Sequence, residues 1–257
     1  VDGISSYPVM KSNHSFELLS CFPASAEPGG EFTSVTYSNL YFREPESRAD
    51  QTRMMGIVTT APETGYYVDV FRSRKEKGGD KMHDYFYHNL GQTLTLTAAD
   101  GTDLNLQPTE ELAFAGAHLY AYSYLYDKKV AATGKDVKAT FTIDMKDKGG
   151  DDISMNLWMK GEPDREVFTA LSPMTEGLSR TPGMPYNIKE QPTLTFVARQ
   201  HGEAWNRPFV AVYEPSTRKE PSAIQAVSYF DAEETALTDF AGICVKSKNG
   251  RTDHIFS

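Results

Sequence analysis

The sequence predicts an all-β protein, a large antiparallel β-sandwich with two layers. Three observations support this fold class. Short segments of alternating apolar and polar residues recur along the chain, turn-forming residues separate them, and no long amphipathic helix fills the gaps. About a dozen such segments at this spacing are typical of a sandwich, whereas a parallel α/β sheet needs a helix between successive strands. We therefore expect a two-layer, supersandwich-like arrangement.

The clearest strand is expected at 137–145. Val137, Ala139, Phe141, Ile143 and Met145 alternate there with polar residues, which indicates one buried and one solvated face. Similar runs predict strands at about 15–22, 33–43, 53–60, 66–74, 82–89, 119–127, 153–160, 193–199, 209–214, 223–230 and 241–247.

Turn residues fix one pairing directly. Asn249-Gly250 is typical of a two-residue hairpin turn, so 241–247 should pair with 252–256. Helices are expected only at Glu110–Ala115 and Ala232–Asp239, each of two turns at most.

The segment 172–192 breaks the rhythm of strands. It carries four prolines and two glycines, and a loop this long is usually functional or crosses between sheets. The chain begins at Val1, and its last hairpin stops at Ser257. We therefore expect one β-sandwich domain over 1–257 that is truncated at both ends, with 172–192 as an internal crossover loop.

Charge and cysteine content exclude several classes. The chain has 26 basic and 35 acidic residues, a net charge of −9, which argues against nucleic-acid binding. No apolar run approaches the roughly 20 residues of a membrane span. Cys21 and Cys244 are too few for a cysteine zinc site, so we expect buried free thiols, with one long-range disulfide as the alternative.

Histidines and acids in 80–88 suggest a metal site, but strand geometry opposes it. His83 and Tyr85 share one face of the expected strand, whereas Asp84 and His88 share the other. Asp84 and His88 lie roughly 13 Å apart along a strand, too far for one ion. We expect buried, hydrogen-bonded histidines and no metal. An acid–base pair of His83 and Tyr85, about 7 Å apart, is the catalytic alternative.

Four tyrosines recur at alternate positions, Tyr120, Tyr122, Tyr124 and Tyr126. On a strand they would form one face roughly 20 Å long, on which sugar rings could stack. Packing of that face under another layer is the alternative, and the one we favour.

A second candidate substrate contact lies at Trp205-Asn206-Arg207, beside His201 and Glu203. We expect these residues in a loop. Trp205 and Arg207 would touch substrate or a neighbouring domain there, or would stabilise the turn; the sequence favours neither role.

Several segments resemble, in order, the β-sheet domain of the heparinase II/III-like polysaccharide lyases. The resemblance covers nearly the whole chain, although no single motif is diagnostic. The segments are Val1–Gly3, Tyr66–Ser73, His83–Asn89, Trp158–Phe168, Gly202–Pro215 and Gly250–Ile255.

The resemblance implies a helical toroid followed by a β-sandwich in a secreted or periplasmic bacterial enzyme. Such lyases cleave acidic polysaccharides by β-elimination, with tyrosine and histidine as base and acid. By resemblance those residues, and a histidine of the zinc site found in some members, precede Val1. No catalytic residue can therefore be assigned to this chain, and the zinc would belong to the intact protein.

The resulting hypothesis is a lyase β-sheet domain that acts on a uronic-acid-containing polysaccharide, glycosaminoglycan- or alginate-like. Its partners would be that polysaccharide and the toroid of the same protein, and the chain alone would be inactive. The alternative is a non-catalytic carbohydrate-binding or adhesion module that uses Tyr122 and Tyr124. A third hypothesis is an autonomous lyase that uses His83 and Tyr85.

Overall fold

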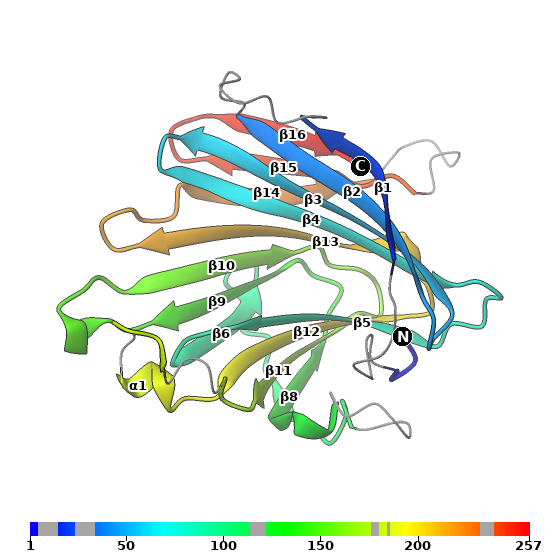
Figure 1. Ribbon diagram of the computed structural model, residues 1–257, viewed down its shortest axis with the longest axis horizontal. Coiled ribbons are helices and arrows are strands. Elements are labelled where there is room, and N and C mark those ends of the chain that lie inside the picture. Colours follow the sequence, from blue (N-terminus) through cyan, green and yellow to red (C-terminus); the bar gives the residue numbers. More distant parts are fainter. Residues whose placement is uncertain (5–14, 24–33, 114–121, 176–179, 184–185, 232–238) are drawn as a thin grey trace.

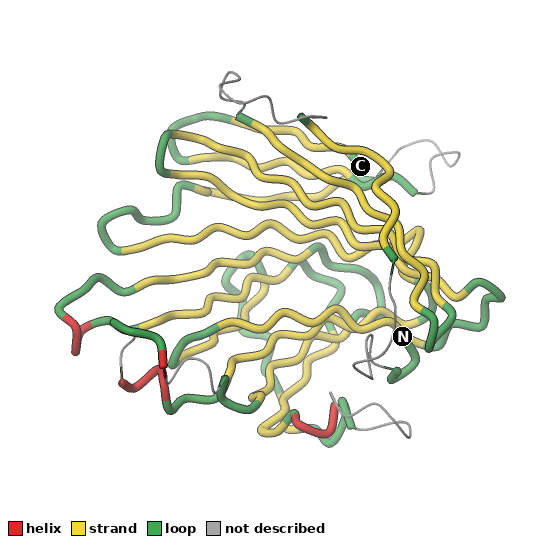
Figure 2. The backbone as a smooth tube through the Cα atoms, in the orientation of Figure 1, coloured by secondary structure: helices red, strands yellow, loops and turns green. Residues whose placement is uncertain are grey.

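The computed structural model describes residues 1–4, 15–23, 34–113, 122–175, 180–183, 186–231 and 239–257. Within these residues the chain forms three antiparallel sheets (Figures 1 and 2). The predicted all-β sandwich is thereby confirmed. A small third sheet adds a layer to the two that the sequence predicts.

The largest sheet has eight strands. Its central strand β13 (Ala204–Thr217) is buried on both sides: Phe209, Ala211 and Tyr213 belong to one core, and Val210 and Val212 to another. A strand with apolar residues at consecutive positions must be covered on both faces. The other seven strands are, in spatial order around it, β1 (Phe16–Phe22), β2 (Val35–Glu44), β3 (Ala49–Ala61), β4 (Thr64–Lys75), then β10 (Ile153–Met159), β9 (Val137–Ile143) and β6 (Thr93–Ala98).

A five-stranded sheet covers one face of the large sheet. Phe141, Leu157, Met159, Phe196 and Phe209 fill the interface and are at most 1% exposed. This interface supplies most of the hydrophobic burial that holds the two sheets together. The strands are, in spatial order, β5 (Met82–Asn89), β12 (Thr193–His201), β11 (Glu166–Ser172), β8 (Tyr126–Ala132) and β7 (Gln107–Pro108).

A three-stranded sheet covers the opposite face. It comprises β14 (Ile224–Phe230), β15 (Gly242–Ser247) and β16 (Thr252–Phe256), and its Ile243 and Val245 pack against Val68 and Val212. The predicted hairpin of 241–247 with 252–256 is confirmed. Its turn is longer than the two residues expected. The Ser247 backbone donates a hydrogen bond to the Arg251 carbonyl, so Lys248 lies in the turn together with Asn249 and Gly250. Gly250, at φ 91°, allows this wider turn.

Other local predictions need correction. The segment 172–192 joins β11 to β12, which are antiparallel neighbours in one sheet, so it does not cross between sheets. Of the helix expected at 110–115, residues 110–113 are not helical and the rest lies outside the described residues. Of the helix expected at 232–239, only Asp239 is described. The short helices found are η1 (Tyr122–Tyr124), η2 (Lys146–Lys148) and α1 (Tyr186–Lys189).

Both cysteines are free thiols, as expected. Cys244 is buried in β15, whereas Cys21 is only half-buried on the edge strand β1. No helix in the described part of the chain is long and apolar enough to cross a membrane.

Candidate functional site

The five-stranded sheet ends at its edge strand β5, while the eight-stranded sheet continues past it through β3, β2 and β1 (Figure 1). The uncovered face of β3 and β4 borders two adjoining cavities of about 640 and 600 Å³. Arg53 lines both of them. We call the two cavities together the β5 groove.

The two cavities of the β5 groove share one floor, which β3 and β4 form. Side chains at alternate positions of β3 point to one face, and each pairs with a residue of β4 whose side chain points the same way. The stretch from Gln51 to Ile57 spans roughly 20 Å along the sheet. The pairs along this floor are Gln51 with Ser73, Arg53 with Phe71, Met55 with Asp69, and Ile57 with Tyr67.

Residues 1–4 lie at one end of the groove. Val1 and Ile4 line the larger cavity. Asp2 anchors them, because its carboxylate accepts hydrogen bonds from the Lys81 and Met82 backbone and lies 3.0 Å from Lys75 Nζ. The start of the described chain is therefore fixed beside the cavity.

Strand β5 forms the other wall, with the division of faces that the sequence predicts. Tyr85 and Tyr87 pack into the core toward the large sheet, whereas Phe86 packs on the outer side. Asp84, also on the outer side, forms a two-pronged ion pair with Arg199, at 2.7 and 2.9 Å. The larger cavity therefore extends around the edge of β5, since Asp84 of this ion pair lines it together with Tyr85 of the inner face.

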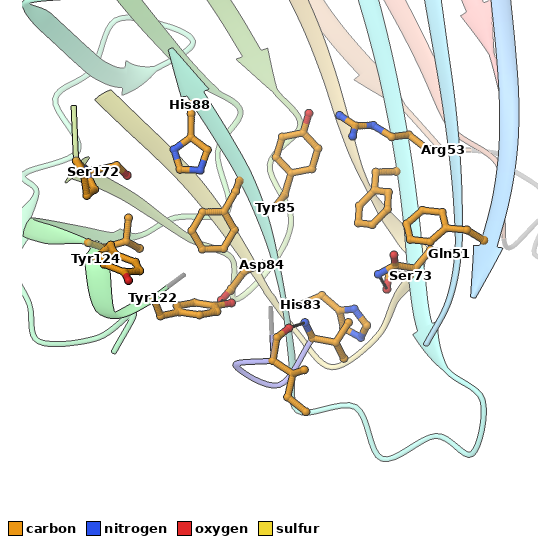
Figure 3. A pocket seen from close by; sticks show the side chains of 17 residues that line it. Gln51, Arg53, Ser73, His83, Asp84, Tyr85, His88, Tyr122, Tyr124 and Ser172 are labelled. Atoms are coloured by element: carbon orange, nitrogen blue, oxygen red, sulfur yellow. Dashed lines mark hydrogen bonds between the residues drawn. The ribbon is translucent and has the colours of Figure 1, made fainter. Parts of the chain in front are cut away.

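Four side chains form a polar network at the middle of the groove. Arg53 donates to both oxygens of Asp69, with Nη2 2.6 Å from Oδ2. The Tyr85 hydroxyl donates to the same oxygen at 2.5 Å and also hydrogen-bonds Tyr213. Figure 3 shows the Arg53 guanidinium and the Tyr85 hydroxyl pointing toward one another.

These contacts set the protonation of the network. Burial, followed by the charge of Asp69, raises the pKa of Tyr85 well above its ordinary value. Burial alone would lower the pKa of Arg53, but its hydrogen bond to Asp69 raises it. Tyr85 is thus a neutral phenol whose hydroxyl already donates a hydrogen bond to Asp69. This arrangement argues against Tyr85 as the base of an acid–base pair with His83.

His83 is 1% exposed and its Nε2 lies 2.7 Å from Asp80 Oδ1. Burial chiefly lowers its pKa, and the bond to Asp80 partly opposes this effect. The prediction of a buried, hydrogen-bonded histidine is confirmed for His83. His88 is exposed, contrary to expectation, and its Nδ1 bonds Thr195 at 2.9 Å.

No group of three or more histidine, cysteine or acidic side chains suitable for a metal occurs among the described residues.

The row of tyrosines is not a strand face. Tyr122 and Tyr124 lie in the short helix η1, β8 begins at Tyr126, and Tyr120 lies outside the described residues. Tyr122 is buried and donates to Asp84 at 2.7 Å, which agrees with the packing interpretation, whereas Tyr124 is 58% exposed. Both line the larger cavity (Figure 3).

Trp205 and Arg207 do not line the β5 groove. They lie in β13, at the start of an irregularity in its pairing with β4, and not in a loop. The guanidinium of Arg74 lies 4.1 Å from the centre of the Trp205 ring, and Arg207 donates to the His201 carbonyl at 2.9 Å. Their contacts match the stabilising role that the sequence left open.

Sequence reasoning missed the central residues of the groove, Arg53 and Asp69. One signal was present. Asp69 interrupts a buried apolar strand, and a carboxylate in such a place needs a cationic or hydrogen-bonding partner. The partner itself depends on the register of β3 against β4, which the sequence does not reveal.

Comparisons with known proteins agree with the resemblance in the sequence. No family model matches the chain. The chain is 32% identical, over 228 residues, to an endo-acting ulvan lyase of Formosa agariphila. The match covers 86% of the chain and 26% of the relative, so the chain spans about a quarter of that protein.

Among solved structures, heparinase III overlaps 94% of this chain and 27% of its own, at 8% identity and a TM-score of 0.41. Over most of its length the chain is therefore similar in sequence to part of a polysaccharide lyase, in agreement with the resemblance that its motifs carry.

Proposed function

We propose that the chain is the β-sandwich part of a lyase that cleaves an acidic, uronic-acid-containing polysaccharide by β-elimination. The observation that carries this proposal is the 32% identity, across most of the chain, to an ulvan lyase. Ulvan is therefore the first substrate to test, and glycosaminoglycans and alginate are the next.

In this proposal the chemistry is completed by residues outside the chain. The resemblance places the catalytic histidines and tyrosine before Val1, and Val1 itself lines the β5 groove. The N-terminal toroid of the same protein would form the opposite wall of the substrate cleft. The whole enzyme would work in the periplasm or outside the cell, and any zinc would be held by residues beyond this chain.

The β5 groove supports a substrate-binding role for the sandwich. β-Elimination removes the proton beside a carboxylate, and the reaction is favoured when a cation neutralises that carboxylate. Arg53 supplies a half-exposed cation in the groove. Tyr85 and His83, by contrast, are buried and hydrogen-bonded to acidic partners. In this proposal they hold the wall of the groove in place and do not exchange protons with the substrate.

The test is to incubate the chain with ulvan, heparin, heparan sulfate, chondroitin sulfate, hyaluronan and alginate. Product is followed by the ultraviolet absorbance of the unsaturated uronide, and binding by affinity electrophoresis. We expect retention by at least one acidic polysaccharide without product. Product formation would show that the acid and base lie within this chain, and failure to bind any polymer would contradict a role in the cleft.

A non-catalytic carbohydrate-binding module is the second candidate. It is favoured by exposed tyrosine rings beside the two cavities, since Tyr67 and Tyr124 are 43 and 58% exposed. The two candidates differ in the behaviour of a longer protein that contains this chain. Such a protein yields unsaturated product if the chain is part of a lyase, and none if it is only a binding module.

A further inference from the structure

We propose that Arg53 is the residue that binds the acidic group of a uronic-acid saccharide in the β5 groove. This inference rests on the proposed function and adds to it a specificity-determining residue and a binding register. The ligand would lie along β3 and β4, with one carboxylate on Arg53 and sugar rings in the cavities on either side.

The first argument is that Arg53 has free donors in a fixed orientation. Its Nε and Nη2 are held by Asp69, whereas Nη1 has no partner among the described residues. The Asp69 side chain is 5% exposed and the Arg53 side chain 41%. A buried carboxylate thus holds a guanidinium whose remaining N–H groups are accessible. An oriented arginine can bind a carboxylate with little loss of side-chain entropy.

The second argument is the distribution of charge. Among the residues that line either cavity, Arg53 is the only arginine or lysine. The two acids there are paired, Asp84 with Arg199 and Asp69 with Arg53 itself, so the Arg53–Asp69 pair has no net charge and offers a ligand the remaining N–H groups of the guanidinium. No unpaired carboxylate among these lining residues would repel an anionic ligand beside Arg53.

The third argument comes from two buried polar atoms without a partner. Gln51 Oε1 and His83 Nδ1 both belong to residues that line the larger cavity (Figure 3). Since Asp80 accepts the proton of His83 Nε2, Nδ1 is an acceptor, as is the amide oxygen. Two buried acceptors without donors suit a ligand rich in hydroxyl groups. A saccharide offers both these donors and the carboxylate that Arg53 requires.

The fourth argument is the shape of the groove. Asp69 and the exposed Tyr67 continue the floor beyond Arg53 into the second cavity. Tyrosine rings with polar tips are suited to sugar rings, which have apolar faces and hydroxyl edges. The cation therefore lies at the middle of a groove and not at the end of a closed pocket, as an extended polymer requires.

The test measures affinity for the polysaccharide that the unaltered chain retains most strongly in the panel above. Arg53→Gln should weaken this affinity at least about tenfold, since it removes a charge-assisted hydrogen bond. Asp69→Asn should weaken it less, because the charge stays but its orientation is loosened. Arg74→Gln is the matched control, since Arg74 is exposed, lies on the neighbouring strand β4 and contacts Trp205 outside the groove.

Arg53→Lys guards against a loss of folding, because it keeps the charge and should bind better than Arg53→Gln. If Arg53→Gln binds as tightly as the unaltered chain, or if Arg74→Gln loses as much, the inference is overturned while the proposed function stands. If the unaltered chain binds no acidic polysaccharide, the inference and the groove's part in the proposed function both fail.

Discussion

Two arginine–aspartate pairs lie on opposite sides of β5, and they differ in what they leave open. Arg199 and Asp84 are 5 and 1% exposed, and Arg199 uses its third donor on Glu111 at 2.8 Å. In the β5 groove, Arg53 is 41% exposed and its Nη1 has no partner in the described part of the chain. The outer pair is saturated by protein and the inner pair is not. A pair of the same chemical type can thus serve stability on one face and binding on the other.

The largest expected effect comes from breaking the buried pair of Arg199 and Asp84. Arg199→Gln leaves the Asp84 carboxylate buried with Tyr122 as its one side-chain donor among the described residues, and removes the guanidinium packed over Phe168. Such a loss should lower the free energy of unfolding by about 3–5 kcal/mol. Urea denaturation measures it. A cost below about 1 kcal/mol would mean that the pair is solvated and that the contrast with Arg53 is unfounded.

The same substitution in the pair of Arg53 and Asp69 should cost less stability. Arg53→Gln leaves Asp69 with the Tyr85 hydroxyl, and water can reach the vacated side of the groove. We expect a loss of about 1–2 kcal/mol in the same denaturation experiment, together with the loss of saccharide affinity described above. The two arginines should therefore reverse their order between the two assays. If the two substitutions had equal effects in each assay, the proposed distinction between Arg53 and Arg199 would be contradicted.

His83 should make the stability of the folded chain depend on pH. Its pKa is lowered from 6.5, chiefly by burial, so the unfolded chain takes up the proton more readily than the folded one. Stability should therefore be full above pH ~6.5 and fall as the pH drops below it, by up to about 1.4 kcal/mol for every tenfold difference in proton affinity between the two states. Denaturation between about pH 7 and 5 should show a shallower decline for His83→Gln. An unchanged slope would indicate that His83 titrates alike in both states.

The smallest expected effect is at the rim of the groove. Tyr124 is 58% exposed, so Tyr124→Ala should change the free energy of unfolding by less than about 0.5 kcal/mol. Tyr122→Ala, which removes a buried ring, should cost about 3–5 kcal/mol and serves as its counterpart. Loss of saccharide affinity in Tyr124→Ala at unchanged stability would add this ring to the groove. Large destabilisation would show that the ring is packed after all.

Local pattern predicted much of the fold. The alternation in β9 and the turn residues between Ser247 and Arg251 act over a few residues, and both gave the correct element. The strand expected at 119–127 is wrong at 122–125, where the alternating tyrosines mimic a strand. Asp127 has a positive φ of 48°, and the backbone before it turns through η1. Period-two spacing alone cannot distinguish such a segment from a strand.

Less of the site than of the fold could be predicted from the sequence, for a physical reason. His83, Tyr85, Tyr122 and Tyr124 were all considered, and all line the larger cavity. The decisive pair was missed because Arg53 and Asp69 meet through the register of β3 on β4. The groove itself exists only because one sheet is wider than the layer on its face. Neither register nor sheet width is encoded in a short window of sequence.

The most direct test of the account is a four-way binding comparison. The unaltered chain and Arg53→Gln are each titrated with the best-retained acidic polysaccharide, and with the same polymer after its carboxyl groups are reduced to alcohols. The account predicts that reduction weakens binding to the unaltered chain at least about tenfold, and has little effect on the variant. Equal losses in the two proteins would contradict it, because Arg53 would then not be the partner of the carboxylate.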